Sequence, residues 1–120
     1  MRGKRVLMIA ALLVVFAVAA FAANPVLDFK LINKTGVDIH ELYVSAANVD
    51  SWEEDVLGVD ILSDGDSVEI TFPGKVKATK FDLKIVDEDQ NELEWYDLPL
   101  DEINELTLVV KGSKATATWK

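Results

Sequence analysis

The chain has 120 residues, which favours a single domain, and it carries 21 acids against 12 bases, a formal net charge of −9. This negative charge disfavours binding to nucleic acid or to anionic lipid, because both are themselves negatively charged. The absence of cysteine excludes disulfides, thiolate metal sites and a lipid-modified cysteine anchor, so stability must come from the buried core.

The first 23 residues predict a secretory signal peptide. Cationic residues at positions 2, 4 and 5 precede an apolar run over residues 6–21, and Ala20-Phe21-Ala22 has the small-x-small pattern of a cleavage site. We expect cleavage after Ala22 or Ala23, which leaves one β-sandwich domain over residues 24–120. An uncleaved membrane anchor is the alternative, although the run is shorter than the roughly 20 residues of a spanning helix. Cleavage leaves nine bases against 21 acids, a net charge of −12.

Alternating apolar and polar residues predict the first strand of the domain at residues 26–33. A turn at residues 33–36 follows, and residues 37–44 read as the returning strand. The alternation of this second strand slips near His40 and Glu41. The slip predicts a β-bulge, because an extra residue changes the face to which the side chains point.

The segment after this strand predicts a short helix near residues 51–57. Ser51 and Glu54 have the spacing of a capping box, and Gly58 stands where a helix-terminating glycine is expected. A helix this short needs tertiary contacts, so we expect Trp52 to anchor it to the sandwich. The alternative is that Trp52 contacts a ligand.

Strand patterns continue to the C-terminus. In chain order they predict strands at residues 67–72, 77–87, 93–100, 105–112 and 113–120. The last two form a hairpin over Gly112 and Ser113. We expect Trp95 in the core and Trp119 partly exposed. About seven short strands without a long helical period predict an all-β fold, a single antiparallel β-sandwich of the immunoglobulin-like or C2-like kind.

Acidic loop residues are candidate calcium ligands. Asp87, Asp89 and Asn91 have the spacing that begins a calcium loop, but Glu92 replaces its sixth-position glycine and Leu98 its twelfth-position glutamate. An EF-hand is therefore not predicted. A sandwich can instead pool acids from several loops at one end. The candidate ligands of such a site are Asp50, Asp55, Asp87 and Asp89.

The sequence offers little for catalysis. His40 is the only histidine, so a Ser-His-Asp triad would depend on it, and no nucleophile-elbow pattern accompanies a serine. We expect a noncatalytic, periplasmic or secreted protein that binds an unknown extracytoplasmic protein or ligand. It would need no cofactor, and it would bind no nucleic acid and, after signal cleavage, no membrane. The alternatives are a calcium-dependent binding module and, second, a small hydrolase.

Three segments carry a resemblance to a known group of proteins. "LYVSAANVDSWEEDVLG" ends at Gly58, "SVEITF" occupies residues 67–72, and "FDLKIVDEDQN" ends at Asn91. With these the chain resembles a group of small exported bacterial proteins of unknown function, over about Phe29 to Trp95. The resemblance implies export and a β-sandwich, but no activity. The chain departs from the pattern at Glu53 and at Gln90, where glycine is usual, and the second departure argues against a tight turn there.

Overall fold

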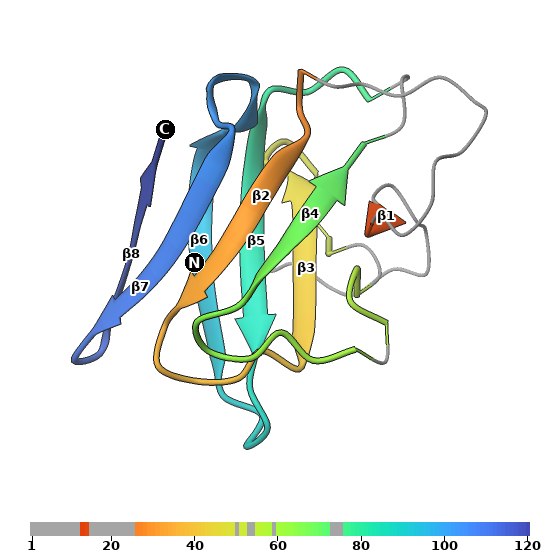
Figure 1. Cartoon of the computed structure of the whole chain (residues 1–120). Helices are drawn as coiled ribbons and strands as arrows, with labels where there is room; N and C mark the ends of the chain where they lie inside the picture. The colour runs from red at the N-terminus through yellow and green to blue at the C-terminus, as the bar shows by residue number, and fades with distance from the viewer. Residues whose placement is uncertain (1–12, 15–25, 50, 53–54, 59, 73–75) are drawn as a thin grey trace.

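The computed structural model shows an all-β fold built from two sheets (Figure 1), which confirms the all-β part of the predicted fold class. The structure describes residues 13–14, 26–49, 51–52, 55–58, 60–72 and 76–120. The larger sheet has the strand order β1-β4-β2-β7-β8, and the smaller has the order β3-β5-β6. In chain order the strands are β1 (Leu13–Val14), β2 (Phe29–Lys34), β3 (Glu41–Ala46), β4 (Ser67–Thr71), β5 (Lys80–Val86), β6 (Glu92–Pro99), β7 (Glu105–Lys111) and β8 (Lys114–Trp119).

Helical structure is minimal. Among the described residues the one helical turn is the 3-10 helix η1 (Leu100–Glu102), between β6 and β7. None of these residues belongs to a helix long and apolar enough to cross a membrane.

Strands β2 to β8 match the strands predicted from alternation, with ends that differ by a few residues. The predicted C-terminal hairpin is confirmed, because Lys111 pairs with Lys114 and Gly112 takes a positive φ of 62° between them. One pairing differs from the predicted antiparallel arrangement. Strands β2 and β7 run parallel, with Lys30 opposite Glu105. A parallel pair needs a long crossover connection, and here the chain builds the entire smaller sheet and β4 between the two strands.

The two sheets enclose one apolar core. Alternation buries Leu31 of β2 and Leu83 of β5 completely, and both belong to the same hydrophobic cluster. Phe72, directly after β4, packs between the two layers, with ring centroids 6.4 Å from Phe29 and 5.1 Å from Phe81. Each such buried side chain contributes on the order of 2–3 kcal/mol of hydrophobic free energy.

The predicted return of residues 37–44 beside the first strand is wrong. Strand β2 lies in the larger sheet and β3 in the smaller, so the segment between them crosses from one sheet to the other. Ile39 forms an isolated bridge with Leu62, and β3 begins only at Glu41. The slip in the alternation therefore marks the change of sheet and not a bulge, because the residues before and after it face the core from different layers.

A buried asparagine holds this crossover together. The Asn33 side chain is fully buried, and its Nδ2 donates to the Val37 carbonyl at 2.8 Å and to the Leu62 carbonyl at 3.0 Å. Its Oδ1 accepts hydrogen bonds from the amide and the hydroxyl of Thr35. All of its side-chain hydrogen-bonding capacity is thus used inside the protein, as a buried amide requires.

A bulge does occur, between β5 and β6. Trp95 pairs with Leu83 and Leu98 with Phe81, so two residues of β6 oppose the single residue Asp82. The second of them, Asp97, has φ at +57° and donates its amide to the buried Asp82 Oδ1 at 3.0 Å. The bulge exposes Asp97 and keeps both Trp95 and Leu98 in the core.

The predicted helix near residues 51–57 is not formed by the described residues. Ser51 is a bend, Trp52 is a bridge residue and Val56 begins a turn, while Glu53 and Glu54 of the predicted capping box lie outside the described part. Trp52 and Val56 also belong to different clusters, whereas one helix face would have joined them. On either side of residues 53–54, Trp52 packs on Tyr43 of β3 and the Val56 amide donates to the Leu42 carbonyl of β3, as described below.

Candidate functional site

Trp52 lies in a small cluster on the outer face of the smaller sheet. Leu42 and Val44 of β3 enter the main core, so Tyr43 between them points to the other face, where it meets Trp52. The two ring centroids are 6.4 Å apart. We call Tyr43, Trp52, Lys84 and Val86 the Trp52 cluster.

A lysine is buried against both rings of this cluster. Lys84 stands opposite Tyr43 across β3 and β5, and its Nζ lies 4.7 Å from the Tyr43 centroid and 5.3 Å from the Trp52 centroid. Both distances suit cation–π attraction, which strengthens as the cation loses water. Lys84 also lies 4.0 Å from a Glu92 carboxylate oxygen. The cluster therefore holds the Lys84 ammonium group against two aromatic rings.

The Trp52 ring is not available to a ligand from solvent, because only 1% of Trp52 is exposed. The expectation that Trp52 anchors its segment is met by this burial, although the described residues of the segment form no helix. Tyr43 donates its hydroxyl to Glu41. Burial, and then this hydrogen bond with the Glu41 carboxylate, raise the pKa of Tyr43 well above its usual value, so the phenol stays neutral.

Asp55 is hydrogen-bonded to the outer edge of β3. Its Oδ1 accepts the amide of Leu42 at 2.8 Å and the amide of Leu57 at 3.0 Å. The Val56 amide returns a hydrogen bond to the Leu42 carbonyl at 2.8 Å. The segment thus replaces a neighbouring strand at this edge, which protects the backbone groups of β3 from other chains. Gly58 follows with φ at +63°, which a glycine adopts without steric cost.

Asp87 organises the turn between β5 and β6. Its Oδ1 accepts the amides of Asp89 and Asn91, both at 2.9 Å, and its Oδ2 accepts the Asn91 side-chain amide at 3.1 Å. These hydrogen bonds, chiefly those from Asn91, lower the pKa of Asp87. The turn is therefore most stable when Asp87 is ionised, and its contribution is lost as the pH falls through that lowered pKa.

The tight turn forms although Gln90 replaces the expected glycine. The Gln90 amide donates to the Asp87 carbonyl at 3.1 Å, and Gln90 takes φ at +67°. The departure from the glycine pattern is thus accommodated by strain in the backbone and not by a different turn, since a side chain at positive φ costs roughly 1 kcal/mol.

Replacing Gln90 with glycine is expected to stabilise the protein by about 0.5–1 kcal/mol, because the strained conformation becomes unstrained. Gln90 is exposed, so few contacts are lost with its side chain. Urea denaturation measures the change, with Gln90→Ala as the matched control that shortens the side chain and keeps the strain. A Gln90→Gly protein no more stable than Gln90→Ala would contradict this reading of the turn.

Two of the predicted calcium loops lie at one end of the smaller sheet. Glu41 pairs with Val86, so Asp87 follows the end of β5 where β3 begins, and Asp55 binds the amide of Leu42 at that same end. Asp89 is exposed in the same turn as Asp87, whereas Asp50 lies outside the described residues. Within the described part of the chain, no group of three or more histidine or carboxylate side chains is placed to hold a metal.

Two other aspartates accept backbone amides from distant parts of the chain, and the sequence patterns did not predict these hydrogen bonds. Asp28 Oδ1 accepts the Phe72 amide, and Asp64 Oδ1 accepts the Gly36 amide, both at 2.9 Å. Burial raises the pKa of Asp28, and the hydrogen bond from Phe72 opposes that rise. These partners are 28 or more residues apart in the sequence, so no local motif indicates them.

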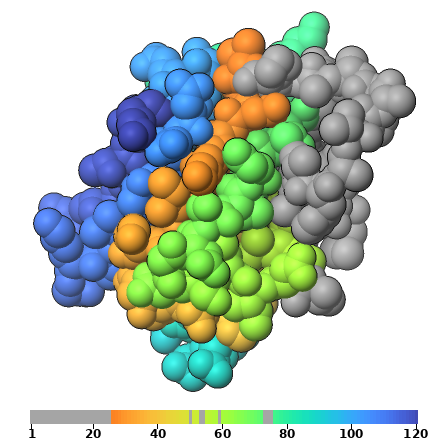
Figure 2. Space-filling view, in the orientation of Figure 1, coloured from red at the N-terminus to blue at the C-terminus, as the bar shows by residue number. Residues whose placement is uncertain are grey.

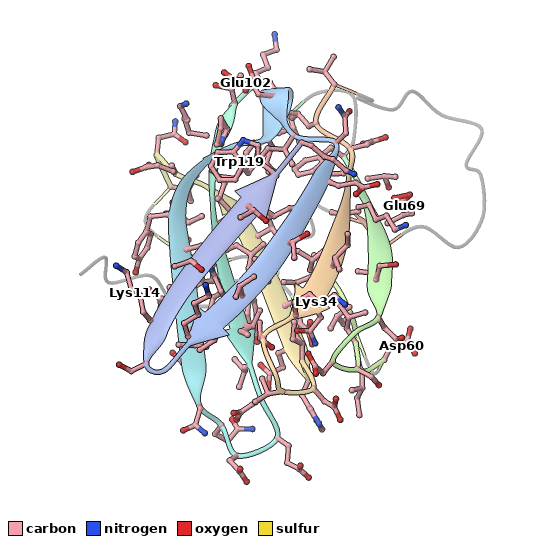
Figure 3. All side chains as sticks on the ribbon, turned by 60° about the vertical axis from the view of Figure 1, so that its left-hand side comes forward. Lys34, Asp60, Glu69, Glu102, Lys114 and Trp119 are labelled. Carbon is pink, nitrogen blue, oxygen red and sulfur yellow. The ribbon has the colours of Figure 1, made fainter. Side chains whose placement is uncertain are left out.

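The other tryptophans occupy the predicted environments. Trp95 is buried in the main core, and its Nε1 donates to the Thr116 carbonyl at 2.9 Å, which ties β6 to β8. Trp119 is 45% exposed at the end of β8, where Figure 3 shows it on the front strand.

Comparison with known proteins bears on the fold. A scan against protein-family models finds no match, and neither does a search of curated proteins. The NMR structure of a protein from Eubacterium rectale is similar, with a TM-score of 0.52 and 14% sequence identity over 77% of this chain and 85% of that chain. At this identity the likeness supports the two-sheet architecture alone.

Proposed function

We propose that the chain is an exported, noncatalytic β-sandwich protein that binds a partner in the periplasm or outside the cell. Its sandwich would be of the immunoglobulin-like or C2-like kind, released from a signal peptide by cleavage after Ala22 or Ala23. The small exported bacterial proteins that share its LYVS and SW segments would be its relatives.

The observation that carries the noncatalytic part of the proposal is the use of the loop carboxylates. Asp55 and Asp87 each accept two backbone amides through Oδ1. A general base or nucleophile needs its oxygens directed at a substrate, whereas these oxygens are directed at the protein's own turns. The predicted leader over residues 1–23 supports export, and the net charge of −9 supports solubility.

Expression of the full chain in a bacterial host tests the export. We expect the periplasmic fraction to contain a protein whose intact mass lacks the first 22 or 23 residues. The control variant carries Ala20→Arg and Ala22→Arg, which remove the small side chains that signal peptidases accept and should leave the leader attached. A full-length protein in the soluble cytosol would overturn the proposal.

A calcium-dependent binding module is the second candidate, because Asp38, Asp87, Glu88 and Asp89 line one shallow hollow, although no three carboxylates of the described residues are close enough together to hold a metal in this structure. Under the leading proposal the melting temperature is the same in millimolar calcium and in chelator. A ligand bound only to the native state raises stability by RT ln(1 + [L]/Kd), about 2.7 kcal/mol at a hundredfold excess over Kd. A rise that magnesium does not reproduce, and that Asp89→Asn removes, would favour the calcium module instead.

A further inference from the structure

The edges of the two sheets are closed in different ways. The outer edge of β3 is covered by Asp55 and Val56, as described above. At the other side of the molecule, β6 and β8 are joined by the hydrogen bond from Trp95 to the Thr116 carbonyl. In the larger sheet β4 lies between β2 and the two-residue strand β1; Figure 2 shows the row β8, β7, β2, β4, and Figure 3 labels Glu69 of β4.

The outer edge of β4 presents backbone groups ready for another strand. The Asn33 amide donates to the Asp66 carbonyl, and Phe29 pairs with Ile70, so the even-numbered residues of β4 point their backbone groups toward β2. Hydrogen-bonding direction alternates along an antiparallel strand. The amides of Ser67 and Glu69 therefore point away from β2, toward the outer edge.

In the full chain this edge is occupied by a piece of the leader. Strand β1 pairs antiparallel with β4, Leu13 opposite Thr71 and Val14 opposite Ile70. Both β1 residues belong to the apolar run of the predicted signal peptide. Cleavage after Ala22 or Ala23 would remove them, and no other described strand lies along this edge of β4.

We propose that the outer edge of β4, in the exported form, accepts an extended apolar segment of a partner protein as an added antiparallel strand. The proposal rests on the export proposed above, which vacates the edge. An exposed edge strand is a template for strand addition, and binding of this kind draws affinity from main-chain hydrogen bonds and specificity from alternate side chains. The occupant of the same edge in the full chain belongs to the apolar run of residues 6–21, so the proposed partner segment is apolar as well.

A hollow beside the start of β4 extends this acceptor surface. Leu57, Ile61 and Val68 contribute its apolar lining, and Ile61 is 52% exposed. Val14 of β1 stands opposite Ile70. If a partner strand keeps this register, its residue two positions after the one opposite Ile70 stands opposite Val68. A strand of five or so residues along β4 would thus reach the hollow and cover Ile61 with an apolar side chain.

The test uses the cleaved protein recovered from the periplasm and a fluorescent peptide of the sequence ALLVVF with lysines at both ends for solubility. We expect saturable binding by fluorescence anisotropy, and protection of the Glu69 amide from hydrogen exchange when peptide is added. Glu69→Pro removes the outward amide and leaves pairing with β2 intact, because proline is tolerated on edge strands. It should weaken binding by about tenfold or more, a loss of roughly 1.4 kcal/mol.

Matched variants and peptides separate strand addition from unspecific apolar contact. Glu69→Ala keeps the amide and should bind the peptide as the unmodified protein does, whereas Ile61→Lys should weaken it through the hollow. A peptide with a central proline should not bind. Equal affinity of the Glu69→Pro and Glu69→Ala proteins, or absence of saturable binding, would overturn the proposal.

Two further outcomes remain distinguishable. Dimerisation of the cleaved protein that Glu69→Pro abolishes would assign the edge to a second copy and overturn the proposed occupant. The intact mass of the same preparation reports export independently. If the leader is retained, the proposed export fails, and so does an acceptor edge for partners, because β1 then stays in place and Glu69 is protected without peptide.

Discussion

Replacing Trp52 with alanine is expected to lower the free energy of unfolding by about 3–5 kcal/mol. The ring is 1% exposed and packs on Tyr43, so its removal leaves a cavity on the outer face of the smaller sheet. It also takes one of two aromatic faces from Lys84, which is itself buried. A domain of this size has about 5–15 kcal/mol of stability in total, so the loss is a large share of it.

Urea denaturation followed by circular dichroism measures this loss. Trp119→Ala is the control, because Trp119 is 45% exposed and should cost far less. Trp52→Phe keeps an aromatic face for Lys84 and should recover part of the stability. If Trp52→Ala were as stable as the unmodified protein, the anchoring role would be wrong and the segment would again be a candidate binding surface.

Replacing Asn33 with aspartate is expected to cost about 3 kcal/mol or more at neutral pH, although the two side chains have nearly the same shape. The carboxylate keeps the acceptor for Thr35 and loses both donors to the Val37 and Leu62 carbonyls. The Leu62 carbonyl keeps the Ile39 amide and the Val37 carbonyl keeps the Thr35 hydroxyl, so each lost hydrogen bond costs roughly 0.5–1.5 kcal/mol. The new charge would also be fully buried, which raises its pKa.

The pH dependence of this variant provides an internal check. A raised pKa in the folded state means that the neutral acid is favoured on folding, so the deficit shrinks as the pH falls and the acid regains one donor. The matched control is Asn48→Asp, which makes the same change of charge at an exposed position. Equal stabilities of the two variants across the pH range would show that the Asn33 donors do not hold the crossover.

The strands were predictable from the sequence because a half-buried strand has a period of two. Residues 105–108 show this clearly, and the same alternation predicted Trp95 in the core. Alternation says which face of a strand is buried, but it does not say which strand is its neighbour. The change of sheet between Asn33 and Glu41 therefore looked like a bulge, and the true bulge at Asp97 was missed.

The site was less predictable because its polar contacts join distant parts of the chain. The spacing of Ser51 and Glu54 predicts a helix start, which is an explanation from neighbouring residues only. In the structure Asp55 binds the Leu42 amide, 13 residues away. The Asp87 turn, by contrast, is local. The spacing of Asp87, Asp89 and Asn91 resembles the start of a calcium loop, and in the structure Asp87 accepts hydrogen bonds from the backbone amides of the other two.

The parallel pairing of β2 with β7 has a consequence for the order in which the chain can fold. Lys30 cannot meet Glu105 until most of the domain has emerged from a ribosome or a translocation channel. Contacts so distant in sequence slow folding, because the connecting loop must be closed before they form. A chain that closes its larger sheet this late stays unfolded for longer after synthesis, and the export proposed above would require such an unfolded chain.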